Sequence, residues 1–211
     1  MTVIIRDEQG REVKVNNEEH ISAQLNIHSY KFTVVKELLN VQPDSDVSHE
    51  EYQCEIVPGK QFVNLEFVWE NLKNESWWRG AVQERMITAV MNSRCYSVYL
   101  YKGNDDEKPQ QVGFARVVTD YATFAYIDDV VIDPEYRGLG IGSQLNRAIM
   151  EDPDLQTFRR WFLIACDKVE KLYENVGFKR LHNPDIFMEI YNGDAYVNDE
   201  EIMKAMRNDK I

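Results

Sequence analysis

The sequence predicts an α/β (α+β) fold in which a central sheet is flanked by helices and preceded by a small N-terminal appendage. Strand-like segments, whose apolar residues alternate or run on continuously, are interspersed with segments whose apolar residues recur at helical spacing. Of the 211 residues, 44% are hydrophobic and 28% are charged, so the chain can bury a sizeable core. A typical domain holds about 150 residues, which makes this chain one core with an appendage.

The first fifty residues are expected to form a hairpin, a helix and a linker. Alternating apolar residues on either side of a polar turn predict a hairpin over residues 2–15. The helical spacing of apolar residues predicts a helix over residues 30–38. The polar stretch Val41–Glu51 is the expected linker, so we place the end of the appendage near residue 50.

The remaining sequence is expected to interleave strands and helices. Residues 158–166 form an almost unbroken apolar run, which is typical of a strand covered on both faces. The chain is thus expected to divide into an appendage (1–50), a main domain (51–195) and a helical tail (196–211). In chain order we expect a strand at 52–57, helices at 62–73 and 81–92, strands at 96–101, 112–118 and 124–132, a helix at 142–151, a strand at 158–166, a short helix at 168–175, a strand at 186–191 and an amphipathic helix after Asn198.

The charge balance and the cysteines exclude several classes of protein. With 24 basic and 36 acidic residues the formal net charge is −12, which repels nucleic acid. This acidity serves solubility or, alternatively, an acidic pocket for cationic amines. Cys54, Cys95 and Cys166 lack the spacing of a disulfide framework or a zinc site, and we expect them to be reduced and buried. The longest apolar run, residues 161–166, is too short to span a bilayer, so we expect a cytoplasmic protein without a membrane partner.

The most informative segment joins an expected strand to an expected helix. The strand ends before Pro134, and three glycines at alternate positions, Gly138, Gly140 and Gly142, lead into the helix. The first N–H groups of a helix are unpaired and its dipole adds partial positive charge, so such a turn suits a pyrophosphate. Arg137 adds a fixed positive charge. The spacing matches neither a P-loop nor a dinucleotide fingerprint, and a turn that binds nothing is the alternative.

This turn resembles the signature of the GNAT superfamily of N-acetyltransferases, which is Arg or Gln, two residues, Gly, one residue, and Gly or Ala. Arg137, Gly140 and Gly142 match that signature. The resemblance covers about residues 52–192 and implies a GNAT-like mixed, mostly antiparallel central sheet flanked by helices. Other segments that look like the family follow in family order at residues 76–78, 91–93, 113–120 and 172–178.

In this family the amides of the turn hold the pyrophosphate of acetyl-CoA, and the preceding strand splays from its neighbour so that its end pairs with the pantetheine arm. The resemblance therefore implies acetyl-CoA as co-substrate, no metal, and direct acetyl transfer to a primary amine in a ternary complex. A non-catalytic acyl-CoA-binding sensor or partner-binding protein is the alternative, and a homodimer is left open. The implied cofactor-binding residues are Val130, Val131, Ile132, Arg137, Gly138, Leu139, Gly140, Ile141, Gly142 and Ser143.

Acetyl transfer to an amine needs a base for the amine, stabilisation of an oxyanion and an acid for the departing thiolate. Tyr173 matches the tyrosine that members of this family place near the CoA sulfur as general acid, and a phenol with a pKa of about 10 suits that step. The alternative is that Tyr173 only packs its helix against the sheet. A backbone N–H at Val130 or Val131 is expected to meet the oxyanion.

Asp128 and Asp129 are the candidate bases, since carboxylates in an apolar strand are rare unless paired or functional. Successive strand residues point to opposite faces, so at most one of the two is expected to face the amine. Asp129 best matches an acidic position of the family, whereas strand parity could select Asp128. An ion pair with Arg116, or deprotonation through water, is the alternative. Four aromatic residues are expected either to wall the acceptor pocket or to belong to the core: Trp77, Trp78, Tyr121 and Tyr126.

Overall fold

A six-stranded sheet forms the centre of the molecule. The computed structural model describes residues 3–6, 12–15, 29–38, 48–102, 108–166 and 169–208. Neighbouring strands are antiparallel except for the last pair, β7 and β8, which confirms the mixed, mostly antiparallel sheet that the family resemblance implies. The strand order follows the chain: β3 (Tyr30–Leu38), β4 (Ser48–Pro58), β5 (Arg94–Tyr101), β6 (Gln110–Thr119), β7 (Phe124–Ile132) and β8 (Arg160–Phe162).

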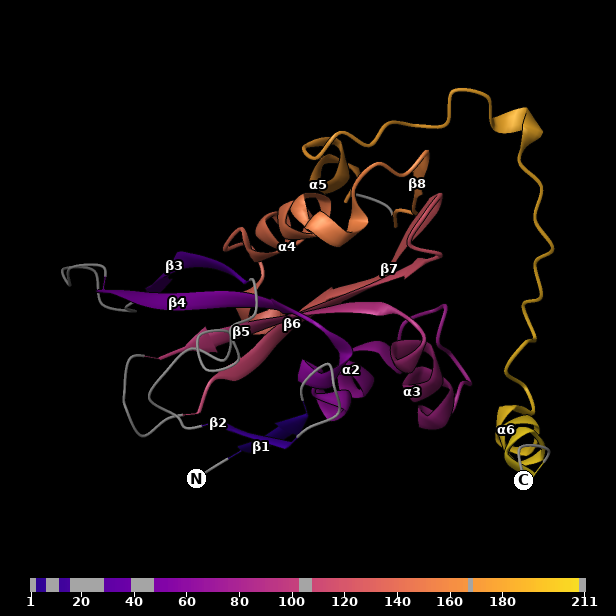
Figure 1. Ribbon diagram of the computed structural model, residues 1–211, viewed down its shortest axis with the longest axis horizontal. Coiled ribbons are helices and arrows are strands. Elements are labelled where there is room, and N and C mark those ends of the chain that lie inside the picture. Colours follow the sequence, from indigo (N-terminus) through magenta and orange to yellow (C-terminus); the bar gives the residue numbers. More distant parts are fainter. Residues whose placement is uncertain are drawn as a thin grey trace.

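Helices cover both faces of this sheet (Figure 1). The helices α2 (Leu65–Leu72) and α3 (Gln83–Met91) lie on one face, and α4 (Ile141–Glu151) and α5 (Glu170–Glu174) lie on the other. Each face has its own apolar cluster, one centred on α4 and one on α2 and α3. The remaining elements are α6 (Asp199–Asn208) and the 3-10 turns η1 (Lys60–Phe62), η2 (Pro134–Tyr136), η3 (Pro153–Leu155) and η4 (Pro184–Ile186).

Residues 30–38 form a strand and not the expected helix. Apolar residues four apart, as in Tyr30 and Val34, fit a strand as well as a helix, because four is a multiple of the strand period of two. Phe32, which lies between them, also packs against the core and thus fixes the period at two. All nine residues of β3 pair with β4, so the main-chain hydrogen bonds with β4 stabilise a strand here and not a helix.

The ends of the chain confirm two local predictions. The strands β1 (Val3–Arg6) and β2 (Glu12–Val15) pair as an antiparallel hairpin. The helix α6 begins after Asn198, whose carbonyl accepts the N–H of Ile202 at 3.1 Å. Residues 41–47 of the expected linker lie outside the described residues, and residues 48–51 belong to β4. The three-part division of the chain stays a prediction.

The segments after α4 are less regular than the sequence predicts. The expected strand at 158–166 is reduced to the three residues of β8, and residues 186–191 pair with no strand of the described sheet. Cys54 and Cys95 are buried as expected, whereas Cys166 is exposed because the strand ends before it. Among the described residues, none of the helices has the length and apolar content needed to cross a membrane.

Candidate active site

The start of α4 has the geometry of an anion site. Gly138 and Gly140 have φ angles of 80° and 82°, in the left-handed region that favours glycine. Gly140 is the N-cap of α4 and has no side chain to accept the first N–H groups, and the first turn of the helix contains no acidic residue. A Cβ at either glycine would have no atom within 4 Å, so a ligand has room to reach the backbone.

Arg137 lies beside this turn. Its Nε donates to the carbonyl of Ile132 at 2.9 Å, which fastens the guanidinium to the end of β7. Within the described part of the chain, Arg137 forms no ion pair with an acidic side chain. Gly142 lies under Leu172 of α5, since a Cβ there would be 3.7 Å from that side chain and 3.8 Å from Ile132. The end of β7, the start of α4 and α5 therefore converge, and the predicted residues 130–132 and 137–143 come together.

The strands β7 and β8 separate where the family resemblance implies a splay. They pair only from Phe124 to Tyr126 with Arg160 to Phe162, and from Ile127 onwards β7 has no partner on this side in the described sheet. Tyr126 stacks on Phe162 at the last paired position, with ring centroids 5.9 Å apart. On this side Val130–Ile132 have no strand partner and can hydrogen-bond to an extended ligand, while the carbonyl of Ile132 already accepts from Arg137.

A β-bulge at Asp129 changes which residues of β7 face α4. The register with β6 shifts by one residue between Asp128 and Val131, and Asp129 has a φ of 49°. Before the bulge Ile127 belongs to the cluster under α4, and after it Val130 packs against that cluster while Val131 belongs to the cluster of α2 and α3. One extra residue exchanges the two faces of the strand.

The carboxylate of Asp129 is held by three donors. The indole Nε1 atoms of Trp77 and Trp78 donate to Oδ1 at 3.0 and 2.7 Å, and Arg116 Nε donates to Oδ2 at 2.6 Å. The residue is only 4% exposed. A left-handed φ is costly for a residue other than glycine and persists where the surroundings fix it, as these bonds do here.

Asp128 has a different environment from its neighbour. It also pairs with Arg116, its Oδ1 accepts the N–H of Asp129 at 3.0 Å, and its side chain is 25% exposed. The expectation that successive residues point to opposite faces was wrong here, because the bulge lets both carboxylates reach one guanidinium. Burial raises the pKa of Asp128, the charge of Asp129 raises it further, and Arg116 offsets part of that increase.

Tyr173 lies on α5 and is half-buried beside Phe178, with ring centroids 6.2 Å apart. Burial raises its pKa to about 12, and negative charge at Cys166 and Asp128 contributes to the increase. Tyr173 also lines a pocket of about 560 Å³ formed with β8, the residues after it and residues 178–181.

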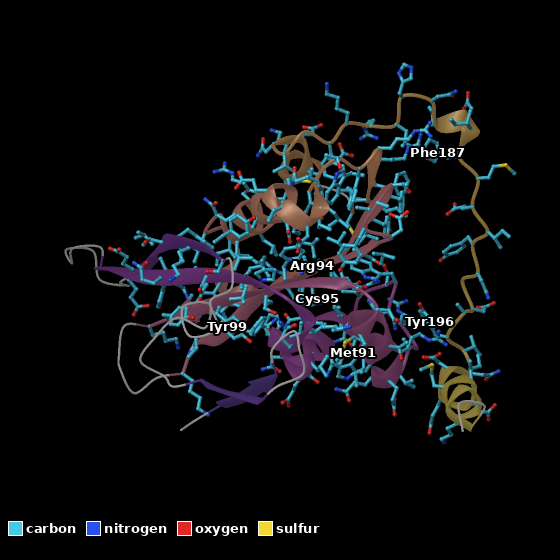
Figure 2. All side chains as sticks on the ribbon, in the orientation of Figure 1. Met91, Arg94, Cys95, Tyr99, Phe187 and Tyr196 are labelled. Carbon is cyan, nitrogen blue, oxygen red and sulfur yellow. The ribbon has the colours of Figure 1, made fainter. Side chains whose placement is uncertain are left out.

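Contacts from the C-terminal segment are the part of this region that sequence reasoning missed. Tyr196, which is labelled in Figure 2, lies on this segment. It stacks on Trp78 with ring centroids 6.4 Å apart, and Arg85 of α3 lies over its ring. Asp199 accepts the N–H of Val82 at 2.9 Å and pairs with Arg85. The helix-start pattern at Asn198 predicts α6 but not its contact with α3. Of the four aromatic residues proposed as pocket walls, Trp77 and Trp78 bind Asp129, Tyr126 lies at the splay, and Tyr121 is exposed in the turn before β7.

Comparison with known proteins places this geometry in a family context. The family model of the acetyltransferase (GNAT) domain matches residues 95–180, which include β7, the start of α4 and Tyr173. A crystal structure of a GNAT-family protein from Xanthomonas campestris pv. campestris, described as an acetyltransferase, is 31% identical, with a TM-score of 0.61, and covers 68% of this chain and 96% of that chain. A structure from Deinococcus radiodurans R1 has 20% identity and a TM-score of 0.50, covers 68% of this chain and 91% of that one, and supports the fold alone.

Curated sequences give the same family with partial coverage. A protein of Gibberella zeae assigned as an acetyltransferase is 32% identical over 119 residues, which is 49% of this chain and 66% of that protein. GCN5-related N-acetyltransferase 2, chloroplastic, of Arabidopsis thaliana is 36% identical over 81 residues, or 37% of this chain and 31% of that protein. The chain thus spans less than two thirds of the length of these curated relatives.

Proposed function

Because this chain belongs to the GNAT superfamily of acetyltransferases, we propose that it transfers the acetyl group of acetyl-CoA directly to a primary amine within a ternary complex. The observation that carries the proposal is the glycine turn at the start of α4, which has no side-chain cap. Arg137 lies next to this turn, α5 packs against it, and the adjoining end of β7 has no strand partner on the β8 side. Whole-protein activity and substrates are part of this proposal, since the curated relatives are matched over part of their length.

The residues present fit acetyl-CoA. The N–H groups of Gly138–Ser143 and the charge of Arg137 would hold the pyrophosphate, and the free edge of Val130–Ile132 would pair with the amides of the pantetheine arm. Acetyl-CoA supplies a thioester whose thiolate leaves as the amine is acylated. The backbone N–H of Val130 or Val131 would stabilise the oxyanion.

Tyr173 would protonate the departing thiolate. Its pKa of about 12 keeps the phenol protonated throughout the neutral range, so the proton is available when the thiolate forms. Tyr173 belongs to α5. This helix packs against the start of α4 through Leu172 and Gly142, so it lies next to the turn that would hold the pyrophosphate.

We assign the base to Asp128 and a structural role to Asp129. All three strong donors around Asp129 are bonded to its carboxylate, so a proton from an amine would compete with two indoles and a guanidinium. Asp128 is more exposed, and its raised pKa makes it a better proton acceptor than an ordinary aspartate once it is ionised. It would act directly or through one water. The net charge of −12 favours an acceptor that is cationic in solution.

The first test is stabilisation by acetyl-CoA, followed by thiol release over a panel of primary amines. A ligand that binds only the folded state raises the melting temperature, so absence of a shift at millimolar acetyl-CoA contradicts the CoA site. Thiol release that depends on the amine supports the transferase. Stabilisation without turnover on the panel would favour a CoA-binding sensor.

Tyr173→Phe tests the acid. We expect kcat to fall by about 100-fold or more while the shift with acetyl-CoA is kept, because only the proton donor is lost. Tyr99→Phe is the matched control: this hydroxyl, which donates to the carbonyl of Phe62 at 2.5 Å, belongs to β5 away from the splay (Figure 2). Unchanged kcat in Tyr173→Phe contradicts the assignment.

A further inference from the structure

The guanidinium of Arg116 is divided between two carboxylates. Its Nε donates to Asp129 Oδ2 at 2.6 Å, and its Nη2 forms an ion pair with Asp128. These two nitrogens lie on one edge of the planar guanidinium, and such an edge ordinarily binds both oxygens of a single carboxylate. Here each carboxylate receives one of the two donors, while Nη1 lies 3.5 Å from Ser93 Oγ. Arg116 therefore links the two carboxylates directly.

The sheet and the bulge together produce this bridge. Arg116 and Asp128 are directly opposite one another in the register of β6 and β7. In a regular strand the next side chain would point to the other face of the sheet. The bulge, with the left-handed φ of 49° at Asp129, brings the second carboxylate to the same guanidinium. The irregular backbone is thus the reason that one arginine has two acidic partners.

The two ends of the bridge differ in how tightly they are held. Asp129 is 4% exposed, and the indoles of Trp77 and Trp78 donate to its second oxygen, so it anchors the arginine. In the described part of the chain, Oδ2 of Asp128 accepts from Arg116 and its Oδ1 accepts from the N–H of Asp129. Each oxygen of Asp128 thus keeps a lone pair. The bridge orients this carboxylate and leaves it able to accept a proton.

The bridge also sets the local charge. Two carboxylates share one guanidinium, so the three side chains carry one surplus negative charge. Burial raises the pKa of Asp128, the charge of Asp129 raises it further, and Arg116 lowers it. The other titratable groups here, Tyr126 of β7 and Tyr173 of α5, are neutral, because burial raises the pKa of each phenol to about 12. Among the described residues, Arg116 is therefore the cation that favours the ionised form of Asp128.

We propose that Arg116 is a positioning residue for acetyl transfer, which is anchored on Asp129 and holds Asp128 ionised and correctly oriented to accept the proton of the amine. The ion pair is then part of the reaction and not an alternative to it. In that step an N–H bond of the acceptor breaks, an O–H bond of Asp128 forms, and the surplus negative charge disappears. Arg116 itself transfers no proton. The proposal rests on the proposed function, in which Asp128 is the base.

Two substitutions separate orientation from charge. Arg116→Lys keeps the positive charge but lacks the flat edge with two donors, so kcat should fall at least about tenfold while the acid limb of the kcat/KM profile stays in place. Arg116→Gln removes the charge, and Asp129 then acts on Asp128 without compensation. Its acid limb should move to higher pH by about one unit or more. Calorimetric titration should show unchanged affinity for acetyl-CoA in both variants.

Arg94→Lys is the matched control. Arg94 lies at the start of β5, is labelled in Figure 2, and also pairs with two carboxylates, Asp152 and Asp154. The side chains of Arg94 and Arg116 are 18% and 11% exposed, so both substitutions should lower the melting temperature. Only Arg116→Lys should lower kcat. Rates are compared per folded molecule, below the melting temperature of every variant, so that a loss of stability alone leaves kcat unchanged.

The outcomes distinguish this proposal from the proposed function. If the unsubstituted chain releases no thiol in the presence of amines, the proposed function fails and the role of Arg116 fails with it. If that chain turns over, any of three results overturns the role of Arg116 alone: unchanged kcat in Arg116→Lys, an unmoved acid limb in a folded Arg116→Gln, or an equal fall of kcat in Arg94→Lys. If Arg116→Gln does not fold, Arg116→Lys and its control decide the matter.

Discussion

At Asp128 and Asp129 two identical side chains, one residue apart, meet different surroundings. Asp129 is nearly inaccessible and accepts from Trp77, Trp78 and Arg116. Of these three donors Asp128 contacts only Arg116, and its side chain is partly exposed to solvent. A carboxylate whose lone pairs are filled by strong donors stabilises the fold, whereas a partly exposed one with a raised pKa can exchange protons.

Substituting each aspartate by asparagine separates the two roles. Asp129→Asn is expected to lower the free energy of unfolding by about 2 kcal/mol, because Arg116 loses a buried charged partner. Asp128→Asn is expected to lower kcat/KM without loss of stability. The folded-state pKa of Asp128 is raised, so its ionisation costs stability as the pH rises, and an asparagine avoids that cost.

The pH profile gives a second readout of the same pair. A base acts in its ionised form, so kcat/KM should rise with pH through a pKa above the usual aspartate value of about 4, and this limb should vanish in Asp128→Asn. Urea unfolding and initial rates measure the two effects. Loss of the acid limb in a stable Asp129→Asn variant instead would reverse the assignment.

Site residues that belong to a local sequence motif could be predicted from the sequence. Arg137 and Gly140 match the spacing of the family signature, and Tyr173 is assigned by the family resemblance. The conformations of the two αL glycines, Gly138 and Gly140, follow from the strand-to-helix turn. The distinction between Asp128 and Asp129 could not be predicted, because it depends on donors 13 to 52 residues away in the chain. The double-tryptophan sequence contains no sign of which carboxylate it binds.

At the scale of elements, the spacing of apolar residues predicts most strands and helices. It fails where the same spacing fits both the helical and the strand period. In β3 the spacing of four fits either structure, and only pairing with β4 decides. In β7 the apolar pattern looks continuous, yet the bulge at Asp129 exchanges its faces. β8 has only three residues, and residues 178–181 and 186–191 pair with no strand of the described sheet.

The start of α4 can be tested as an element with paired glycine substitutions. Gly140→Ala and Gly177→Ala both place a Cβ at a left-handed φ, 82° and 99°, with open space around it. Each is expected to cost about 1 kcal/mol of stability. Only Gly140→Ala is expected to weaken acetyl-CoA binding, by about tenfold or more, because its methyl group occupies the space in front of the helix amides.

Calorimetric titration with acetyl-CoA measures this difference, and thermal melts confirm that the strain is matched. Equal loss of affinity in both variants would mean that backbone strain, and not the approach of an anion to the turn, sets the affinity. Retained affinity in Gly140→Ala would place the pyrophosphate elsewhere.

At the scale of the whole molecule, an acidic chain is proposed to bind an anionic co-substrate. The net charge of −12 opposes acetyl-CoA, so the local field of the α4 N-terminus and Arg137 has to exceed the field of the whole surface. The amide groups achieve this without adding formal charge. The acidity of the remaining surface is then compatible with a cationic acceptor.

The C-terminal segment contacts residues next to the candidate site. Asp199 on α6 binds Val82 and Arg85, which are separated from it by more than a hundred residues of chain, and Tyr196 covers Trp78, one of the two donors to Asp129. Docking of α6 thus supports the loop that fixes the bulge of β7. Such a long-range contact has no local signature in the sequence.

Acidification should release α6 through Asp199. Burial raises the pKa of this carboxyl, but the hydrogen bonds from Arg85 and from the N–H of Val82 outweigh it, and the net pKa lies below the usual value. A depressed folded-state pKa contributes stability that is present above the unfolded pKa of about 3.9 and is lost as the pH falls through the folded value. Docking of α6 should therefore persist at neutral pH and fail below about pH 4.

Tryptophan fluorescence during an acid titration measures this release, since Trp78 loses its stacking partner Tyr196. Asp199→Asn removes the charge and should leave α6 loosely bound at all pH values, which abolishes the transition. Glu200→Gln is the matched control, because Glu200 pairs with the neighbouring exposed Lys204 on the same helix and, among the described residues, with no group of α3. A transition that persists in Asp199→Asn would assign the acid response to another carboxylate and leave α6 held by its apolar contacts.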